Sequence, residues 1–229
     1  MRQTQAWADV PKIDLVKTWL RDKVKYKKLI GLALAFLLVA TALGWYYLRS
    51  TASEQQPEII TYSTDTPDET RPDNGYKWRG RAGDPKYIRL PSIQTEGFIQ
   101  NVGVDQNKQV AVPNNIHLAG WFVDSVRPGQ TGLSIVDGHV DGRAETGIFK
   151  RLADLKENDE YAVEMGDGSL KRYRVKKVVA IDTKDAANVL FSQDPKVKSQ
   201  LNLITCGGNF DQQSQQYDKR IIVVSELVS

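Results

Sequence analysis

The sequence has 229 residues, of which 41% are hydrophobic and 26% are charged. These fractions are typical of globular proteins and exclude both wholesale disorder and a polytopic membrane protein. Residues 1–28 carry eight Lys or Arg and three Asp, a net charge of +5, whereas the whole chain carries +3. Residues 29–229 are therefore net negative, which argues against a nucleic-acid partner for the body of the chain.

Residues 29–48 contain no charged side chain and match the roughly 20 residues that one helix needs to cross a bilayer. Lysines precede this segment, and Trp45, Tyr46 and Tyr47 stand near its end. The positive-inside rule then predicts a basic cytoplasmic tail at 1–28, a single-pass transmembrane anchor at 29–48 and an extracytoplasmic remainder, held at the cell membrane. A cleaved signal peptide is the alternative, but its apolar core usually runs only about 7–15 residues.

Residues 49–75 are rich in Pro, Ser, Thr and Asp. Such a composition buries too little apolar surface to offset the entropy of ordering the chain, so we predict a flexible spacer there.

Residues 76–229 form the predicted folded domain, which we expect to be catalytic. Short apolar or alternating runs recur between Gly, Pro, Asn and Asp residues, a pattern typical of an all-β sandwich or barrel. Gly166-Asp167-Gly168 is typical of a hairpin turn, and only 148–155 and 185–190 are predicted as short helices. Strands are predicted at 87–90, 97–104, 109–112, 133–136, 160–165, 170–181, 201–205 and 220–227.

The only cysteine, Cys206, ends one predicted strand and is followed by Gly207-Gly208. A core cysteine more often lies within an apolar run, so this position favours an exposed thiol that acts as a nucleophile with a proton-accepting partner. A buried cysteine that serves as a small hydrophobic residue is the alternative.

His139 follows another predicted strand and lies between Gly138 and Gly142. The glycines let the backbone bend, so we expect the imidazole at the mouth of a barrel, where it can accept or donate a proton near neutral pH. A structural histidine is the alternative. Asp137 and Asp141 flank His139 and are either candidates to orient its ring or ordinary solvated turn residues.

Arg220 opens the last predicted strand. A guanidinium beside a thiolate lowers the pKa of the thiol and can donate hydrogen bonds to a developing oxyanion. The alternatives are a solvated charge that protects a sheet edge and the neighbouring Lys219 in the cationic role. The chain has two histidines and one cysteine without zinc-ligand spacing, so we expect neither a metal nor another cofactor.

Three segments in chain order carry a family resemblance: Gly138-His139-Val140-Asp141, Leu203-Ile204-Thr205-Cys206, and Arg220 before four apolar residues. Their combination resembles the sortases, and the resemblance extends over roughly residues 88–225. Further segments make the chain most like the class F branch. These are Gly120-Trp121-Phe122, Pro128-Gly129-Gln130-Thr131-Gly132, Phe149-Lys150-Arg151-Leu152 and Cys206-Gly207-Gly208-Asn209-Phe210-Asp211.

The resemblance implies a closed β-barrel of about eight strands with short helices, preceded by one transmembrane helix. It implies that Cys206 attacks the Thr–Gly bond of a Leu-Pro-any-Thr-Gly sorting signal and forms a thioacyl enzyme. His139 would protonate the leaving amine, and Arg220 would stabilise the oxyanion together with backbone amides. Thr205 and Gly207, beside the nucleophile, are the substrate-binding candidates.

The resemblance also implies the partners. These are surface proteins that carry the C-terminal sorting signal and an amine acceptor, typically a peptidoglycan precursor, which leaves the surface protein attached to the cell wall. A pilin-polymerising sortase is an alternative with the same chemistry and another amine, and Asp84-Pro85 is then either a candidate lid or an ordinary turn.

Two alternatives lie outside the family. A caspase-like hydrolase also has His before Cys, but that fold needs long helices that the sequence does not predict. A non-catalytic, membrane-anchored β-barrel that only binds a surface ligand would keep Cys206 as a structural residue.

Overall fold

The structure is a computed structural model that describes residues 26–27, 30–32, 34–46, 56–73, 75–213 and 216–229. It contains two compact units, Met1–Glu54 and Gln55–Ser229. In the first unit residues 34–46 are helical, with exposed side chains. Within the described part of the chain, no helix has both the length and the apolar character needed to cross a membrane. The predicted tail and the ends of the predicted anchor lie mostly outside the described residues, and both stay predictions.

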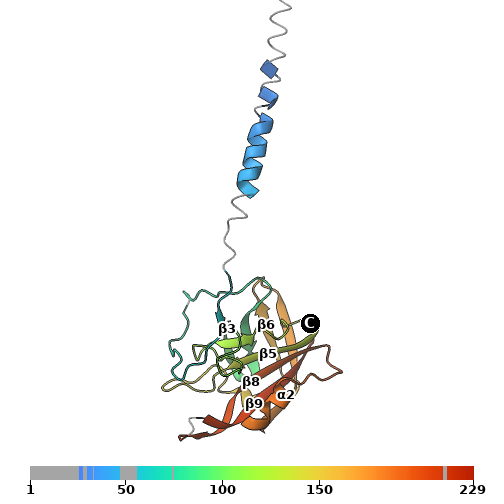
Figure 1. Cartoon of the computed structure of the whole chain (residues 1–229). Helices are drawn as coiled ribbons and strands as arrows, with labels where there is room; N and C mark the ends of the chain where they lie inside the picture. The colour runs from blue at the N-terminus through green and yellow to red at the C-terminus, as the bar shows by residue number, and fades with distance from the viewer. Residues whose placement is uncertain (1–25, 28–29, 33, 47–55, 74, 214–215) are drawn as a thin grey trace, which may run out of the picture. The chain divides into compact units, whose positions relative to one another are not determined.

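Eight strands close into a barrel in the order β3-β2-β6-β7-β9-β8-β5-β4, because β4 also pairs with β3 (Figure 1). Pairs β3–β4 and β5–β8 are parallel, and the other barrel pairs are antiparallel. The all-β barrel predicted from the sequence is therefore confirmed. The strands are β1 (Ile59–Ile60), β2 (Pro85–Leu90), β3 (Thr95–Val102), β4 (Ala119–Phe122), β5 (Gly132–Gly138), β6 (Glu160–Met165), β7 (Leu170–Asp182), β8 (Ser199–Asp211) and β9 (Gln216–Leu227).

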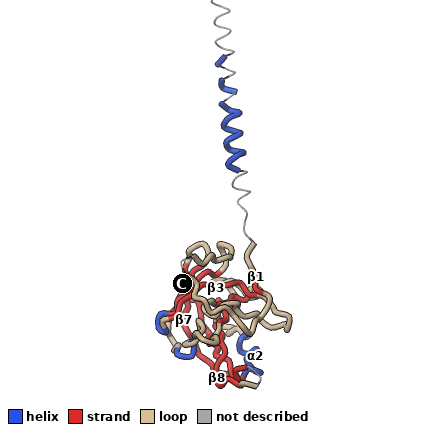
Figure 2. The backbone as a smooth tube through the Cα atoms, turned by 90° about the vertical axis from the view of Figure 1, so that its left-hand side faces the viewer, coloured by secondary structure: helices blue, strands red, loops and turns tan. Residues whose placement is uncertain are grey.

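The two faces of the strands bury different side chains, as the two-residue period of a strand requires. Leu203 of β8 and Val223 of β9 belong to the core inside the barrel. Their sequence neighbours Ile204 and Ile222 belong to a second apolar cluster on the outside. The short helix α2 (Ala186–Leu190) covers that outer cluster; it lies beside β8 and β9 in Figure 1 and near β8 in Figure 2.

Residues 56–73, the second half of the predicted spacer, lie against the barrel; we call this segment the strap. Its strand β1 pairs in parallel with Asn101 and Val102 at the end of β3, beyond the residues that β2 occupies. Ile60 is only 3% exposed. The average composition of residues 49–75 does not predict this attachment, because only two adjacent isoleucines are needed to pair with the barrel and bury apolar surface.

Three local predictions differ from the structure. Residues 109–112 form no strand: the Asp105 carboxylate accepts hydrogen bonds from the backbone N–H groups of Asn107 and Gln109 and folds the chain into a turn. The four-residue strand β4 was not among the predicted strands, because so short a run containing glycine gives a weak signal. At 148–155 only the 3₁₀ turn Leu152–Asp154 is helical. The helix at 185–190 and the hairpin between β6 and β7 are confirmed.

Asp84 ties the start of β2 to the loop that precedes β5, and its loss should destabilise the barrel. Its side chain is 3% exposed and accepts hydrogen bonds from Arg127 Nε at 2.9 Å and from Arg81 N at 2.9 Å. We expect Asp84→Asn to lower the free energy of unfolding by about 1–3 kcal/mol, measured by urea unfolding. The control is Asp154→Asn, which breaks the exposed pair with Arg151 and should cost less than about 0.5 kcal/mol. Equal effects of the two changes would contradict this role.

Candidate functional site

Three neighbouring strands bring His139, Cys206 and Arg220 into one row. Cys206 of β8 is paired directly with Arg220 of β9. The parallel pairing of β5 and β8 ends at Asp137 and Ile204, and two residues further along the two chains come His139 and Cys206. Cys206 and Arg220 lie on the outward-facing rows of their strands, and His139 is the first residue after β5. The sheet register thus brings the segments that carry the three residues side by side.

Strand β8 does not end at Cys206, as the sequence suggested, but continues to Asp211. Its partner β5 ends at Gly138, so Cys206 lies where β8 leaves the barrel and keeps β9 alone as its partner. The pairing is interrupted by a bulge at Gly208, which has φ of +78°. A Cβ atom at this position would overlap the Asp218 carboxylate, so glycine is required there.

His139 is held from the backbone. Its Nε2 lies 2.7 Å from the carbonyl oxygen of Pro113, and because a carbonyl can only accept, Nε2 carries the proton. The neutral ring then has its lone pair on Nδ1. Burial lowers the pKa of His139, and the hydrogen bond to Pro113 partly offsets this effect. The ring is therefore neutral at neutral pH and able to accept a proton.

The Cys206 thiol is half-buried. Burial raises its pKa, the positive charge of Arg220 lowers it, and the Asp137 carboxyl raises it. Burial is the largest of these effects, so the resting group is a thiol and not a thiolate. The resting site thus pairs an uncharged thiol with an uncharged imidazole.

Arg220 supplies the permanent positive charge beside the thiol. Its Nη1 donates to Thr183 Oγ1 at 3.0 Å and to the backbone oxygens of Tyr217 at 3.2 Å and Lys219 at 3.0 Å. These partners are neutral, and Arg220 makes no ion pair with a carboxylate among the residues that the structure describes. Its charge is therefore available to an anion that forms next to Cys206.

Thr205 and Gly207 face the other way from Cys206. Thr205 is 4% exposed and donates from Oγ1 to the Gly138 oxygen at 2.7 Å, which joins β8 to the segment that carries His139. A Cβ atom at Gly207 would lie 2.7 Å from the Ile221 side chain. The structure thus gives these two residues packing roles on the barrel side of the sheet.

The loop after His139 is fixed by residues that the sequence analysis missed. The Glu69 carboxylate of the strap accepts hydrogen bonds from the backbone N–H groups of residues 143–145 at 2.5–2.9 Å. On the opposite side, Asp141 accepts from Lys150 Nζ at 2.6 Å and from Tyr217 O–H at 3.2 Å. Asp141 therefore orients the loop and not the imidazole ring. No local sequence signal connects Glu69 with a loop more than 70 residues away.

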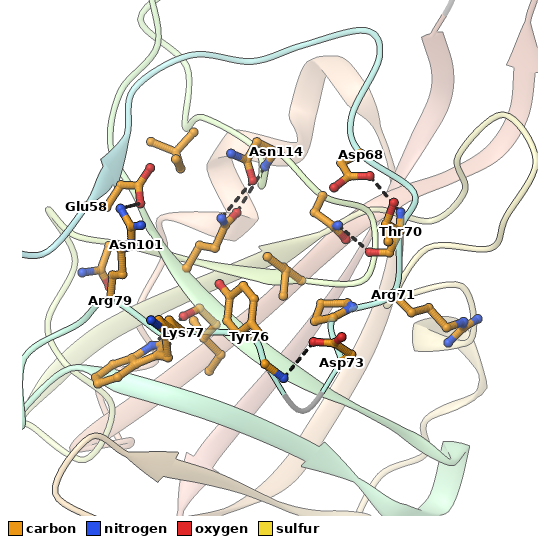
Figure 3. A pocket seen from close by; sticks show the side chains of 18 residues that line it. Glu58, Asp68, Thr70, Arg71, Asp73, Tyr76, Lys77, Arg79, Asn101 and Asn114 are labelled. Atoms are coloured by element: carbon orange, nitrogen blue, oxygen red, sulfur yellow. Dashed lines mark hydrogen bonds and ion pairs between the residues drawn. The ribbon is translucent and has the colours of Figure 1, made fainter.

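A cavity of about 600 Å³ lies between the strap and β3, separate from the cysteine (Figure 3). Its polar lining is bonded internally: Gln100 donates to Asn114 at 2.9 Å, Asn115 donates to the Thr70 oxygen at 2.8 Å, and Asp68 accepts from Thr70 N at 2.9 Å. These contacts attach the strap to the barrel. Since Asn114 follows Pro113, they also fix the segment that holds His139.

Asp84 was a candidate lid residue in the sequence. Its carboxylate instead accepts hydrogen bonds from Arg127 Nε and from the backbone N–H of Arg81. Within the described ranges, no three His, Cys, Asp or Glu side chains are grouped so that they could hold a metal ion.

Comparisons with known proteins identify the family of the domain. Residues 88–228 match the sequence model of the sortase domain, which is more than half of the chain. The chain therefore belongs to the sortase family. Among curated proteins, none matches the sequence. The predicted assignment to class F stays a prediction.

Solved structures share the fold at low sequence identity. Sortase A from Corynebacterium diphtheriae has a TM-score of 0.50 and 23% identity over 66% of this chain and 63% of that chain. A lid mutant of sortase A from that organism gives a TM-score of 0.50 and 24% identity over 66% and 73% of the two chains. Sortase C-1 from Actinomyces oris gives 0.47 and 22% over 64% and 75%. The match thus spans less than two thirds of the first of these chains.

Replacing Arg220 should make the thiol harder to ionise. Because the cation lowers the pKa of Cys206, Arg220→Gln should raise that pKa and shift the pH dependence of iodoacetamide alkylation to higher pH. The matched control is Lys219→Gln, which removes the adjacent cation that is paired with Gly207 and not with Cys206. An equal shift in both variants would show that Arg220 has no special position.

Proposed function

We propose that this sortase is a cysteine transpeptidase that cleaves a Leu-Pro-any-Thr-Gly-like sorting signal between Thr and Gly and joins the threonine to an amine. The observation that carries this proposal is the row of His139, Cys206 and Arg220 across three paired strands at the barrel rim. A nucleophile, a proton acceptor and a fixed cation are the groups that acyl transfer through a thioester requires.

The uncharged resting pair sets the order of proton movements. The Cys206 thiol loses its proton to Nδ1 of His139, and the thiolate attacks the carbonyl carbon of the threonine. The oxyanion that forms is stabilised by the Arg220 guanidinium. When the intermediate collapses, the imidazolium protonates the glycine amine as the Thr–Gly bond breaks. An incoming amine then attacks the thioester, and its surplus proton passes through His139 back to the thiol.

An apolar surface next to Cys206 suits the Leu-Pro part of such a signal. Ile181, Val189 of α2 and Ile204 are partly buried and pack against the outer cluster, and Ile204 precedes Cys206 by two residues on the same face of β8. Side chains that keep part of their surface exposed can bury it against leucine and proline, at about 25 cal/mol per Å².

The proposed setting follows from the N-terminal sequence. A basic tail at 1–28 and an uncharged segment at 29–48 support a single-pass membrane anchor with the catalytic domain outside the cell. The proposed partners are then surface proteins with a C-terminal sorting signal and an amine on a peptidoglycan precursor. Since the Asp84 carboxylate is buried against Arg127, the proposal of a pilin-polymerising sortase loses the lid residue that suggested it.

The test is transfer of a fluorescent sorting peptide to an amine acceptor by the full chain in detergent. We expect Cys206→Ala and His139→Ala to reduce the rate by more than about 10³-fold, because each removes a group that the others need. His117→Gln is the matched control. The ring of this second histidine is hydrogen-bonded to the backbone oxygen of Glu69, and the variant should retain most of the activity. Transfer at the wild-type rate by Cys206→Ala would refute the proposal and favour a ligand-binding barrel.

A further inference from the structure

Asp137 is a buried carboxyl group whose Oδ1 has no hydrogen-bond partner among the described residues, and the proposed reaction does not use it. It faces outward from β5, where it is paired with Gly120 of β4 on one side and with Ile204 of β8 on the other. The residue is 7% exposed, and its Oδ1 is fully buried with no hydrogen bond to any described residue. A Cβ atom at Gly120 would overlap this oxygen, so the glycine leaves the space that the carboxyl occupies.

Such a group needs a physical explanation. Burial raises the pKa of Asp137 well above its ordinary value, which favours the protonated acid, the form that has an O–H to donate. Leaving a buried polar group unpaired costs about 1–3 kcal/mol. Native structures contain few such groups, and each one needs an explanation, such as a functional role or a partner outside the chain.

The position of Asp137 connects it to the proposed peptide groove. Along β5 it precedes His139 by two residues on the same face, and across the sheet it adjoins Ile204, which precedes Cys206 by two residues. It acts electrostatically on the thiol, which places the two groups within interaction range. The carboxyl thus lies between the apolar surface and the reacting atoms.

The chemistry of the proposed signal favours a donor at this point. Proline has no N–H, so a Leu-Pro segment presents more backbone acceptors than donors. An uncharged acid can donate to a peptide carbonyl without the large desolvation cost of a carboxylate next to isoleucine side chains.

We propose that Asp137 is a substrate-binding residue whose buried carboxyl group donates a hydrogen bond to a backbone carbonyl of the sorting peptide. This inference rests on the proposed function and adds one contact to it. The peptide would lie on the outer face of β5 and β8, with its leucine and proline on the apolar surface and its threonine carbonyl at Cys206. Asp137 would help to set the register of the peptide relative to the thiol.

Two substitutions of similar size separate this role from packing. Asp137→Asn keeps an uncharged donor, whereas Asp137→Leu keeps the volume and removes it. In steady-state transfer assays with the full chain in detergent, we expect Asp137→Leu to raise KM for the peptide about 3- to 10-fold with kcat within about 2-fold. Asp137→Asn should stay within about 2-fold of the wild type in both constants. Ser225→Ala, which alters another buried unpaired group, is the control and should leave KM unchanged.

The pH dependence gives a second readout. Once Asp137 ionises at high pH it can no longer donate, so the wild-type KM should rise there while that of Asp137→Asn does not. The other titratable or charged groups near it are His139 just after β5, Cys206 on β8 and Arg220 on β9. Because the charge of Asp137 raises the pKa of Cys206, the pH dependence of Cys206 alkylation is measured in both proteins to separate an effect on the thiol from an effect on KM.

The outcomes are distinct. A wild-type chain that transfers no peptide overturns the proposed function, and the inference with it. A wild-type chain that transfers peptide while Asp137→Leu keeps the wild-type KM overturns the inference alone. So does a change confined to kcat and to the pH dependence of Cys206 alkylation, which would mean that Asp137 acts on the thiol. If Asp137→Leu does not fold, Asp137→Ala replaces it, with folding verified by circular dichroism.

Discussion

The parallel pairing of β5 with β8 is the constraint on which the site depends. Its register ends at Asp137 and Ile204, each two residues before His139 and Cys206, and the antiparallel register of β8 with β9 pairs Cys206 with Arg220. A shift of one residue between β8 and β9 would turn Cys206 or Arg220 to the opposite face of the sheet. Backbone hydrogen bonds thus bring together three chain segments that are far apart in the sequence.

Around this row, the protein surrounds one permanent charge with groups that burial keeps neutral. The pKa of the thiol is raised and that of the imidazole is lowered, so both are uncharged at rest, and burial shifts the pKa of Asp137 in the direction that favours its uncharged form. Arg220 has only neutral hydrogen-bond partners among the described residues. Negative charge that develops on the thiol therefore lies beside a cation that no carboxylate of the described residues neutralises.

Much of the barrel was predictable because its strands follow simple patterns. The alternation at 160–165 and the glycine turn after it predicted β6 and its hairpin, which the structure confirms. The apolar run at 109–112 predicted a strand that does not form, because the Asp105 carboxylate bonds the backbone of this segment and holds it in a turn. The sequence predicted that a strand ends at Cys206. In the structure β8 continues to Asp211, and it is the neighbouring strand β5 that ends, at Gly138. Contacts such as Glu69 with the loop after His139 left no local signal, since they join segments distant in the chain.

The hydrogen bond from His139 to the Pro113 carbonyl has a consequence for how this site can vary. Its acceptor is a main-chain oxygen, so a side-chain substitution at the acceptor residue does not remove it. A substitution at residue 113 can affect this hydrogen bond only by moving the backbone. The neighbouring hydrogen bond between Gln100 and Asn114 helps to hold that backbone in place. The tautomer of the ring is therefore protected against point mutation in a way that the side-chain contacts of Arg220 with Thr183 are not.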